Sequence, residues 1–287
     1  MFDNSDNVLD LSNTDNNSLN EFSKIIQNFN KINIKEMEPT IKNFNKNVIE
    51  ENLNNVIDKL VDLIFEELNK GKEANVIKQQ VLDYIYNQMI FKQQIYNWLI
   101  ENQNDSNSIY LLGYFNYYGI ETKFNEHRAI ELYKRAAELE NKVAQLCLAE
   151  IYIEIDGNLS FKLSNKLANK EYAFGINNLG ICYENGIGTN VNEEKAFEMY
   201  QKAADLGNVS GINNLSWCYY EGIGTDTNKQ KVFELYQKAA DLESLDGINS
   251  LGWCYEKGIG TNIDKQKAFE LYQKAENLEA QLFWLNV

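Results

Sequence analysis

The chain of 287 residues is long enough for one or two domains, and its hydrophobic content of 44% is ordinary for a folded protein. Its formal net charge of −15 argues against nucleic acid and against an anionic membrane surface as partners, because both attract clustered Lys and Arg side chains. If charge selects a partner, it selects a basic protein segment. No apolar run approaches the roughly 20 residues that span a bilayer, and the first residues lack the pattern of a secretory signal, so we expect a cytoplasmic protein and leave a nuclear location open.

The chain begins with a polar segment that is followed by a helical one. Residues 1–40 start with a run rich in Asn, Asp and Ser that buries too little to offset the entropy of ordering, so we expect them to be mostly disordered or weakly helical. In residues 41–105 an apolar stripe with helical spacing runs from Ile49 to Leu68 and stops before Gly71, and two further short helices follow. We expect this helical module to dock on the first of the repeats described next. The stripe could instead form a coiled-coil seam, although it covers only about three heptads.

Residues 106–287 repeat with a period of 36 residues. Three closely similar YQKA segments recur at this spacing, and each follows a segment that begins GINNL or GINSL; the YQKA segments begin at Tyr200, Tyr236 and Tyr272. An earlier copy runs from Ser108, and a partial copy from Ala144 lacks five residues, which we place in its loop because packed helices do not tolerate such deletions.

Each copy has the pattern of two helices. Leu179 and Tyr183 share one face of the first helix, and Tyr200 and Ala204 share one face of the second. A small residue beside the repeat leucine lets the next helix approach, and Gly186 ends the first helix in the left-handed conformation that glycine adopts readily. One hairpin cannot bury both apolar faces, so neighbouring hairpins must stack. The sequence predicts an all-α protein, an α-α superhelical solenoid of about five helical-hairpin repeats preceded by the small helical module.

These residues resemble the Sel-one-like repeat, a relative of the tetratricopeptide repeat, whose pattern is a small residue, Leu-Gly-x-x-Tyr, Gly-x-Gly, Lys-Ala and then Lys-Ala-Ala. The match is specific in the copies from Gly175, Gly211 and Gly247, good in the copy from Ser108 and partial in the copy from Ala144. The resemblance implies a right-handed superhelix that works as a scaffold or adaptor, with the first helices lining its concave surface. Some members of the family carry a protein kinase ahead of the repeats, whereas this chain lacks the kinase motifs.

No pattern in the sequence points to catalysis, so we expect no enzymatic activity, no cofactor and no bound metal. His127 is the only histidine, which excludes a histidine-based triad or a multi-histidine metal site within the chain. Cys182, Cys218 and Cys254 recur every 36 residues. Equivalent helices lie about 8–10 Å apart, beyond the ~7 Å limit for a disulfide, so we interpret these cysteines as buried apolar fillers.

The face of each first helix opposite its buried face is the remaining candidate for function. Trp217 and Trp253 fall on this face, and Trp and Tyr dominate the binding hot spots of interfaces. The tryptophans could alternatively pack on the neighbouring first helix, and one ring can do both. The asparagines beside them offer a donor and an acceptor to an extended peptide. The predicted partner-binding residues are Trp217, Trp253, Ile181, Asn177, Asn178, Asn213, Asn214, Asn249, Glu184, Tyr220 and Glu256.

The sequence therefore predicts a protein–protein interaction scaffold or adaptor that binds a partner protein, or an extended and basic segment of one, on the concave face of the third to fifth repeats. The alternative is a regulatory component of a kinase signalling assembly, in which residues 41–105 dock a separate kinase. Residues 279–285 have the pattern of another first helix. Either this apolar helix caps the array by docking inward, or the chain is a truncated gene product that self-associates through it.

Overall fold

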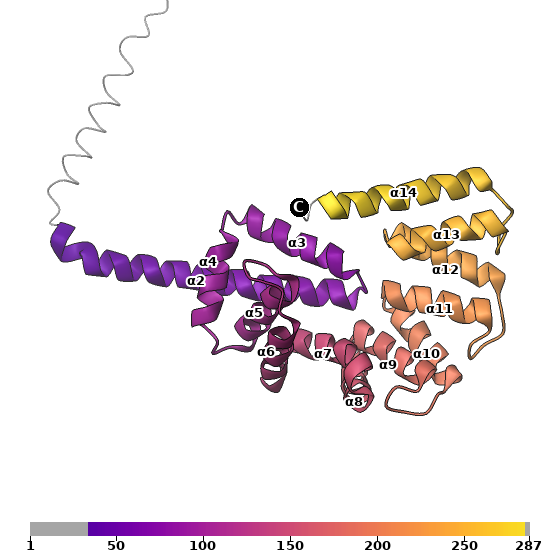
Figure 1. Cartoon of the computed structure of the whole chain (residues 1–287), viewed down its shortest axis with the longest axis horizontal. Helices are drawn as coiled ribbons and strands as arrows, with labels where there is room; N and C mark the ends of the chain where they lie inside the picture. Colours follow the sequence, from indigo (N-terminus) through magenta and orange to yellow (C-terminus); the bar gives the residue numbers. More distant parts are fainter. Residues whose placement is uncertain (1–33, 285–287) are drawn as a thin grey trace, which may run out of the picture. The chain divides into compact units, whose positions relative to one another are not determined.

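The computed structural model describes the backbone of residues 34–284 and the side chains of residues 52–280. The chain groups into two compact units, residues 1–54 and residues 55–287, and each is described by itself. Within residues 34–284 the chain forms thirteen helices, α2 to α14, and no strand (Figure 1). The predicted all-α class is confirmed. The segment of residues 1–40, predicted to be mostly disordered or weakly helical, lies outside the described residues from 1 to 33, and its residues 34–40 belong to a helix.

The described part of the first unit is the beginning of α2 (Ile34–Asn69), and the rest of this helix belongs to the second unit. The helix ends where the sequence predicts, because Gly71 adopts a φ of +70° and its N–H donates to the Leu68 carbonyl over 2.8 Å. Two shorter helices follow, α3 (Ala74–Asn87) and α4 (Lys92–Glu101). The predicted domain boundaries at 40/41 and 105/106 stay predictions.

Five helical hairpins follow in the second unit, as predicted. From the first hairpin on, each helix contacts the next one along the chain, and the first helix of the third hairpin also contacts those of the second and fourth (Figure 1). The hairpins are α5 (Ser106–Tyr118) with α6 (Glu126–Glu138), α7 (Lys142–Ile155) with α8 (Gly157–Ala168), α9 (Ala173–Asn185) with α10 (Glu193–Asp205), α11 (Val209–Glu221) with α12 (Lys229–Asp241), and α13 (Leu245–Lys257) with α14 (Lys265–Trp284). None of the described helices is both long and apolar enough to cross a membrane.

Residues at equivalent positions of the repeat make similar local contacts within the hairpins. A Cβ atom added to Gly180 would lie 2.6 Å from the ring of Tyr200, so glycine is what lets the second helix approach this closely. Asn192 caps the second helix, because its side chain accepts a hydrogen bond from the Lys195 N–H over 2.9 Å. In the partial copy a single residue, Asp156, joins α7 to α8, which places the five missing residues in the loop.

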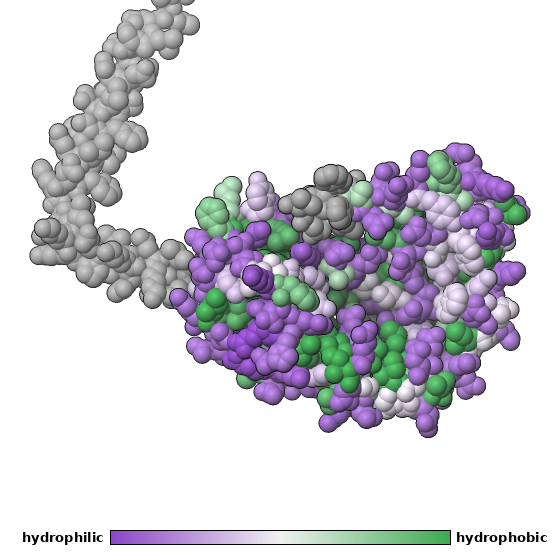
Figure 2. All heavy atoms as spheres, in the orientation of Figure 1, coloured by the Kyte–Doolittle hydropathy of each residue, from purple (hydrophilic) through white to green (hydrophobic). Residues whose placement is uncertain are grey.

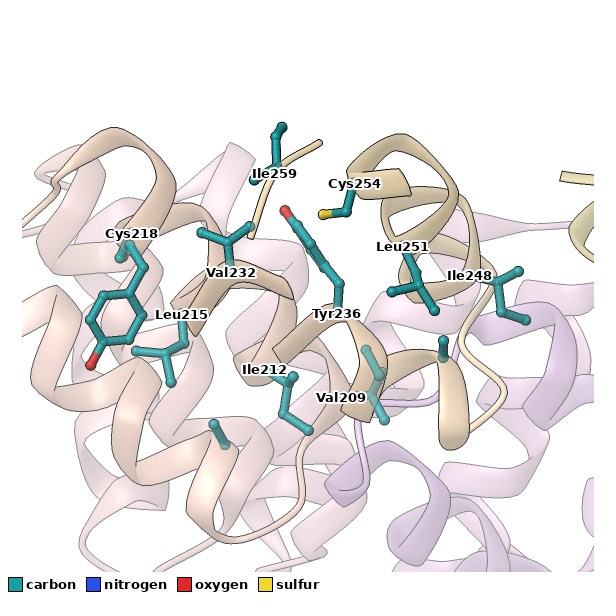
Figure 3. Close-up of a cluster of buried hydrophobic side chains, with 14 of the residues drawn as sticks. Val209, Ile212, Leu215, Cys218, Val232, Tyr236, Ile248, Leu251, Cys254 and Ile259 are labelled. Atoms are coloured by element: carbon teal, nitrogen blue, oxygen red, sulfur yellow. The ribbon is translucent and has the colours of Figure 1, made fainter. Parts of the chain in front are cut away.

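The buried faces of neighbouring hairpins form one continuous core. Figure 3 shows side chains from α11, α12 and α13 meeting in this core, with the Tyr236 ring lying between α11 and α13 and pointing toward Cys254. Leu215 and Leu251 are only 1% and 3% exposed. Stacking of hairpins therefore buries faces that no single hairpin could cover. On the surface, Figure 2 shows mostly hydrophilic residues, with hydrophobic patches in the lower part, around α7 to α9.

The second half of α2 and the turn after it pack against the beginnings of all five first helices, whereas we expected the module to dock on the first repeat alone. The unpaired N–H groups at the start of a helix attract carbonyls and carboxylates. Backbone N–H groups at the starts of α9, α11 and α13 donate to the end of α2 and to the turn after it, whereas at the starts of α5 and α7 side chains donate to carboxylates of α2. The pairs are Asp58 with Asn107, Asp62 with Lys142, Asn69 with Phe174, Lys70 with Val209, and Glu73 with Leu245.

The prediction that residues 279–285 begin a new first helix is wrong in its boundary, because α14 continues without a break to Trp284. In the two preceding repeats the second helix stops, and Asn208 or Ser244 then caps the next helix. Ala280 stands at the equivalent position and has no side-chain oxygen with which to cap. The chain therefore has no signal there to end one helix and start another.

A candidate partner-binding surface

Three aromatic rings on the first helices of the fourth and fifth repeats form a continuous aromatic strip: Trp217, Tyr220 and Trp253. The ring centroids of Trp217 and Tyr220 lie 5.6 Å apart, and those of Tyr220 and Trp253 lie 5.0 Å apart in an edge-to-face arrangement. Trp217 is 46% exposed, while the other two rings are half-buried. The rings therefore pack against each other across α11 and α13, as the alternative interpretation expects, and still present an aromatic face to solvent. That the tryptophans bind a partner stays a prediction.

The predicted asparagines divide into buried and accessible ones. Asn177 and Asn178 are only 4% and 3% exposed, and Asn177 accepts a hydrogen bond from the Asn214 amide over 2.9 Å. This pair ties α9 to α11 and leaves little of Asn177 for a partner. Asn213 is half-buried and Asn249 is exposed. Of the five, Asn249 lies most openly on the surface.

The two predicted glutamates hold the two helices of their own hairpins together. The Tyr200 hydroxyl donates to Glu184 over 2.5 Å, and the Tyr272 hydroxyl donates to Glu256 over 3.1 Å. Hydrogen bonds from Lys257 and from Tyr272 lower the pKa of Glu256. Tyr220 replaces the glutamate at the equivalent position, which frees its ring for the aromatic strip. The remaining predicted residue, Ile181, is half-buried and packs against the core.

A second feature, a cavity of about 470 Å³ between α5, α7 and the α2–α3 turn, contains none of the predicted site residues. Its lining includes Tyr114 and Glu150, which lie two residues after the repeat leucines of the first two copies. Trp217 and Trp253 occupy the same position in the fourth and fifth copies. The repeat register could therefore have identified the cavity residues, had it been applied to the first two copies.

The side chains that could take part in catalysis or metal binding lie apart from one another. Among the residues whose side chains are described, no three His, Cys, Asp or Glu side chains are placed to hold a metal ion. The His127 side chain is 88% exposed. The repeating cysteines are free and buried, as interpreted from the sequence, and burial raises the pKa of Cys218 and Cys254 to about 12.

The family model of the Sel1 repeat matches residues 106–141, 173–208, 209–244 and 245–279. It does not cover the α7–α8 hairpin, the partial copy with the shortened loop. No curated protein matches the sequence.

Two solved structures resemble the chain. The crystal structure of a Sel1 repeat protein from Oxalobacter formigenes is 22% identical with a TM-score of 0.56, and the match covers 72% of this chain and 84% of that one. The crystal structure of c5321, described as a protective antigen of uropathogenic Escherichia coli strains with an SLR fold, is 25% identical with a TM-score of 0.53. That match covers 66% of this chain but only 41% of the E. coli protein.

Sel1 repeats generally serve as scaffolds for protein–protein interaction, and proteins built from them are typically non-enzymatic. The four matched copies agree with the hairpins α5–α6, α9–α10, α11–α12 and α13–α14 in the structure. The chain belongs to the Sel1 repeat family.

Proposed function

We propose that the chain is an interaction scaffold whose third to fifth repeats bind a partner protein on the concave face of the array. The observation that carries the proposal is the aromatic strip, in which a tryptophan that is 46% exposed is held in place by two further rings. Fixed aromatic side chains lose little entropy on binding and supply much of the energy of interfaces. Trp217 is the expected anchor.

The chemistry around the strip favours an extended and basic partner segment. The exposed Glu221 follows Tyr220 directly, and Asn249 lies one turn before Trp253 and is exposed. A carboxylate attracts a Lys or Arg side chain, and an amide can both donate to and accept from a peptide backbone. The net charge of −15 adds a long-range attraction for such a segment.

The test is to replace Trp217 by alanine and compare the proteins that co-purify with the variant and with the unaltered chain. A hot-spot residue is worth at least about 2 kcal/mol, so a captured partner should bind roughly thirtyfold more weakly. Phe269→Ala is the matched control, because Phe269 is 56% exposed and lies outside the strip. Unchanged affinity in Trp217→Ala, with helicity retained by circular dichroism, would remove the proposal.

A second proposal is that the helical module of residues 41–105 docks a separate protein kinase, as a regulatory component of a cytoplasmic signalling assembly. The observation in its favour is the apolar surface at the α3–α4 turn, where Tyr86, Met89 and Phe91 are 82%, 94% and 75% exposed. The double variant Tyr86→Ser and Phe91→Ser should lose co-purifying kinase activity, while Trp217→Ala retains it. Kinase activity that stays with the double variant would contradict this proposal.

A further inference from the structure

The cavity in the first two repeats has walls of two different kinds. On α5, Tyr110, Tyr114 and Tyr118 follow one another at intervals of four residues along one helix face and line the cavity. On α7, Glu150 and Glu154 are likewise four residues apart and line it from the other hairpin. The turn between α2 and α3 completes the enclosure with Gly71 and the charged residues Lys72 and Glu73. An aromatic wall therefore lies beside an acidic one.

The cavity lining carries an excess of negative charge, because it contains four glutamates and a single lysine, Lys72. Glu126, Glu150 and Glu154 line the cavity, and none of the three has a Lys, Arg or His partner within 4.0 Å among the residues whose side chains are described. Glu150 is exposed, yet partial desolvation by the surrounding protein raises its pKa. A bound cation would offset the cost of keeping this carboxylate ionised.

The aromatic wall contains a polar group that has no partner. Tyr114 is only 3% exposed, and its hydroxyl has no hydrogen-bond partner among the described residues. Buried hydroxyl groups without a partner are uncommon in folded proteins and call for an explanation. The rings of Tyr114 and Tyr118 lie 4.5 Å apart and are tilted by 47°, and those of Tyr117 and Tyr118 lie 5.1 Å apart at 73°. Rings inclined to one another present their electron-rich faces in several directions, as in the aromatic cages that hold alkylated ammonium groups.

We propose that this cavity binds an organic cation, an alkylated ammonium group of the size of choline or of a methylated lysine side chain, between the tyrosines of α5 and the carboxylates of α7. The carboxylates supply the charge, and the rings replace the weak hydration of an alkylated ammonium group. The carboxylates are spread along a helix and no three metal-ligand side chains converge among the described residues, so the wall suits a bulky cation better than a metal ion. The proposal does not depend on the aromatic strip, which lies on α11 and α13.

The experiment is a calorimetric titration of the full chain with choline and with 3,3-dimethylbutan-1-ol, which has the shape of choline without its charge. We expect choline to bind at least about tenfold more tightly than the alcohol, because the rings and Glu150 recognise charge. Glu150→Gln and Tyr118→Leu should each weaken choline binding by about tenfold or more. Glu194→Gln, which removes an exposed carboxylate of α10 far along the chain from the cavity, should leave it unchanged.

A peptide that carries trimethyl-lysine, compared with the same peptide carrying norleucine, separates the two sources of the cation. Preference for the charged peptide over choline supports a protein side chain as the natural occupant, and binding of choline alone supports a free small molecule. Equal binding of choline and its neutral analogue, full choline binding by Glu150→Gln, or no binding of either cation at millimolar concentration would overturn the proposal. Circular dichroism of each variant shows that a loss of binding is not a loss of fold.

Discussion

Replacing Asn208 by alanine is expected to destabilise the second unit more than the loss of an ordinary helix cap. Asn208 is fully buried, and its side-chain oxygen accepts from the Gly211 N–H over 2.8 Å at the start of α11. The amide nitrogen of the same side chain donates to the Asn69 carbonyl over 3.0 Å at the end of α2. One side chain therefore caps a repeat and also attaches the helical module to it.

These two hydrogen bonds set the size of the expected loss in the free energy of unfolding. Loss of an N-cap costs about 1 kcal/mol. The partly buried Asn69 carbonyl, left without its donor, costs up to about 1–3 kcal/mol more, which gives at most about 3 kcal/mol in all. For a unit of this size that loss lowers the melting midpoint by roughly 6–12 °C. Asn208→Ser should fall in between, because Ser244 caps the next repeat and shows that serine suits the position.

Urea denaturation followed by circular dichroism measures the difference. The matched control is Asn228→Ala, since Asn228 caps α12 through the Lys231 N–H over 3.1 Å but is exposed and makes no contact with α2. We expect the control to lose only about 1 kcal/mol. If Asn208→Ala costs no more than Asn228→Ala, the bond to Asn69 contributes nothing, and the reasoning about the α2–α3 turn is wrong.

Three further predictions concern a close helix contact, an acidic side chain with a raised pKa and three thiols. Gly180→Ala places a methyl group 2.6 Å from the Tyr200 ring and should cost about 1–3 kcal/mol; an unchanged urea midpoint would contradict this close approach. Burial raises the pKa of Glu150 above its unfolded value, so its ionised form weakens the fold at neutral pH. Glu150→Gln should therefore raise the melting midpoint at pH 7, and the gain should vanish below about pH 4, where the carboxyl is protonated in both states. Native chains should react with a thiol reagent at pH 8 far more slowly than unfolded ones, because burial raises three thiol pKa values to about 12; these thiols belong to Cys147, Cys218 and Cys254.

The repeats could be predicted from the sequence because the contacts that define them recur at multiples of 36 residues. The glycine at position 180 and the tyrosine at position 200 meet in the structure, and the same pair recurs as Gly252 and Tyr272. A periodic pattern shows which residue types are required at which spacing, and from these the two helices and their stacking follow. The short α7–α8 connection was also predictable, since the deletion left the apolar positions of both helices in register.

The attachment of α2 and its turn could not be predicted, because its contacts occur once and have no pattern. Asn69, Lys70 and Glu73 bond to the starts of different first helices. Any carbonyl or carboxylate can satisfy a free N–H at a helix start, so the sequence does not say which segment does so. The burial of Asn177 could not be predicted either. Its position on the helix surface suggested an open site, whereas its pairing with Asn214 depends on the distance between neighbouring hairpins.

Within each first helix, the constant positions and the variable position have separate roles. The repeat leucine is buried in all five copies, and the cysteine three residues later is buried in the last three. The residue two positions after the leucine varies between copies; it is Tyr114, Glu150, Ile181, Trp217 and Trp253 in turn. Substitutions that destabilise the fold should therefore differ from substitutions that weaken partner binding. Leu215→Ala should cost about 2–5 kcal/mol, since Leu215 is only 1% exposed, yet it leaves the aromatic strip in place. Trp217→Ala removes a side chain that is nearly half in water and should change the melting midpoint far less, while it weakens partner binding by roughly thirtyfold. A melting midpoint that falls equally in both variants would mean that the exposed tryptophan is part of the core, and that variation at this position serves packing and not recognition.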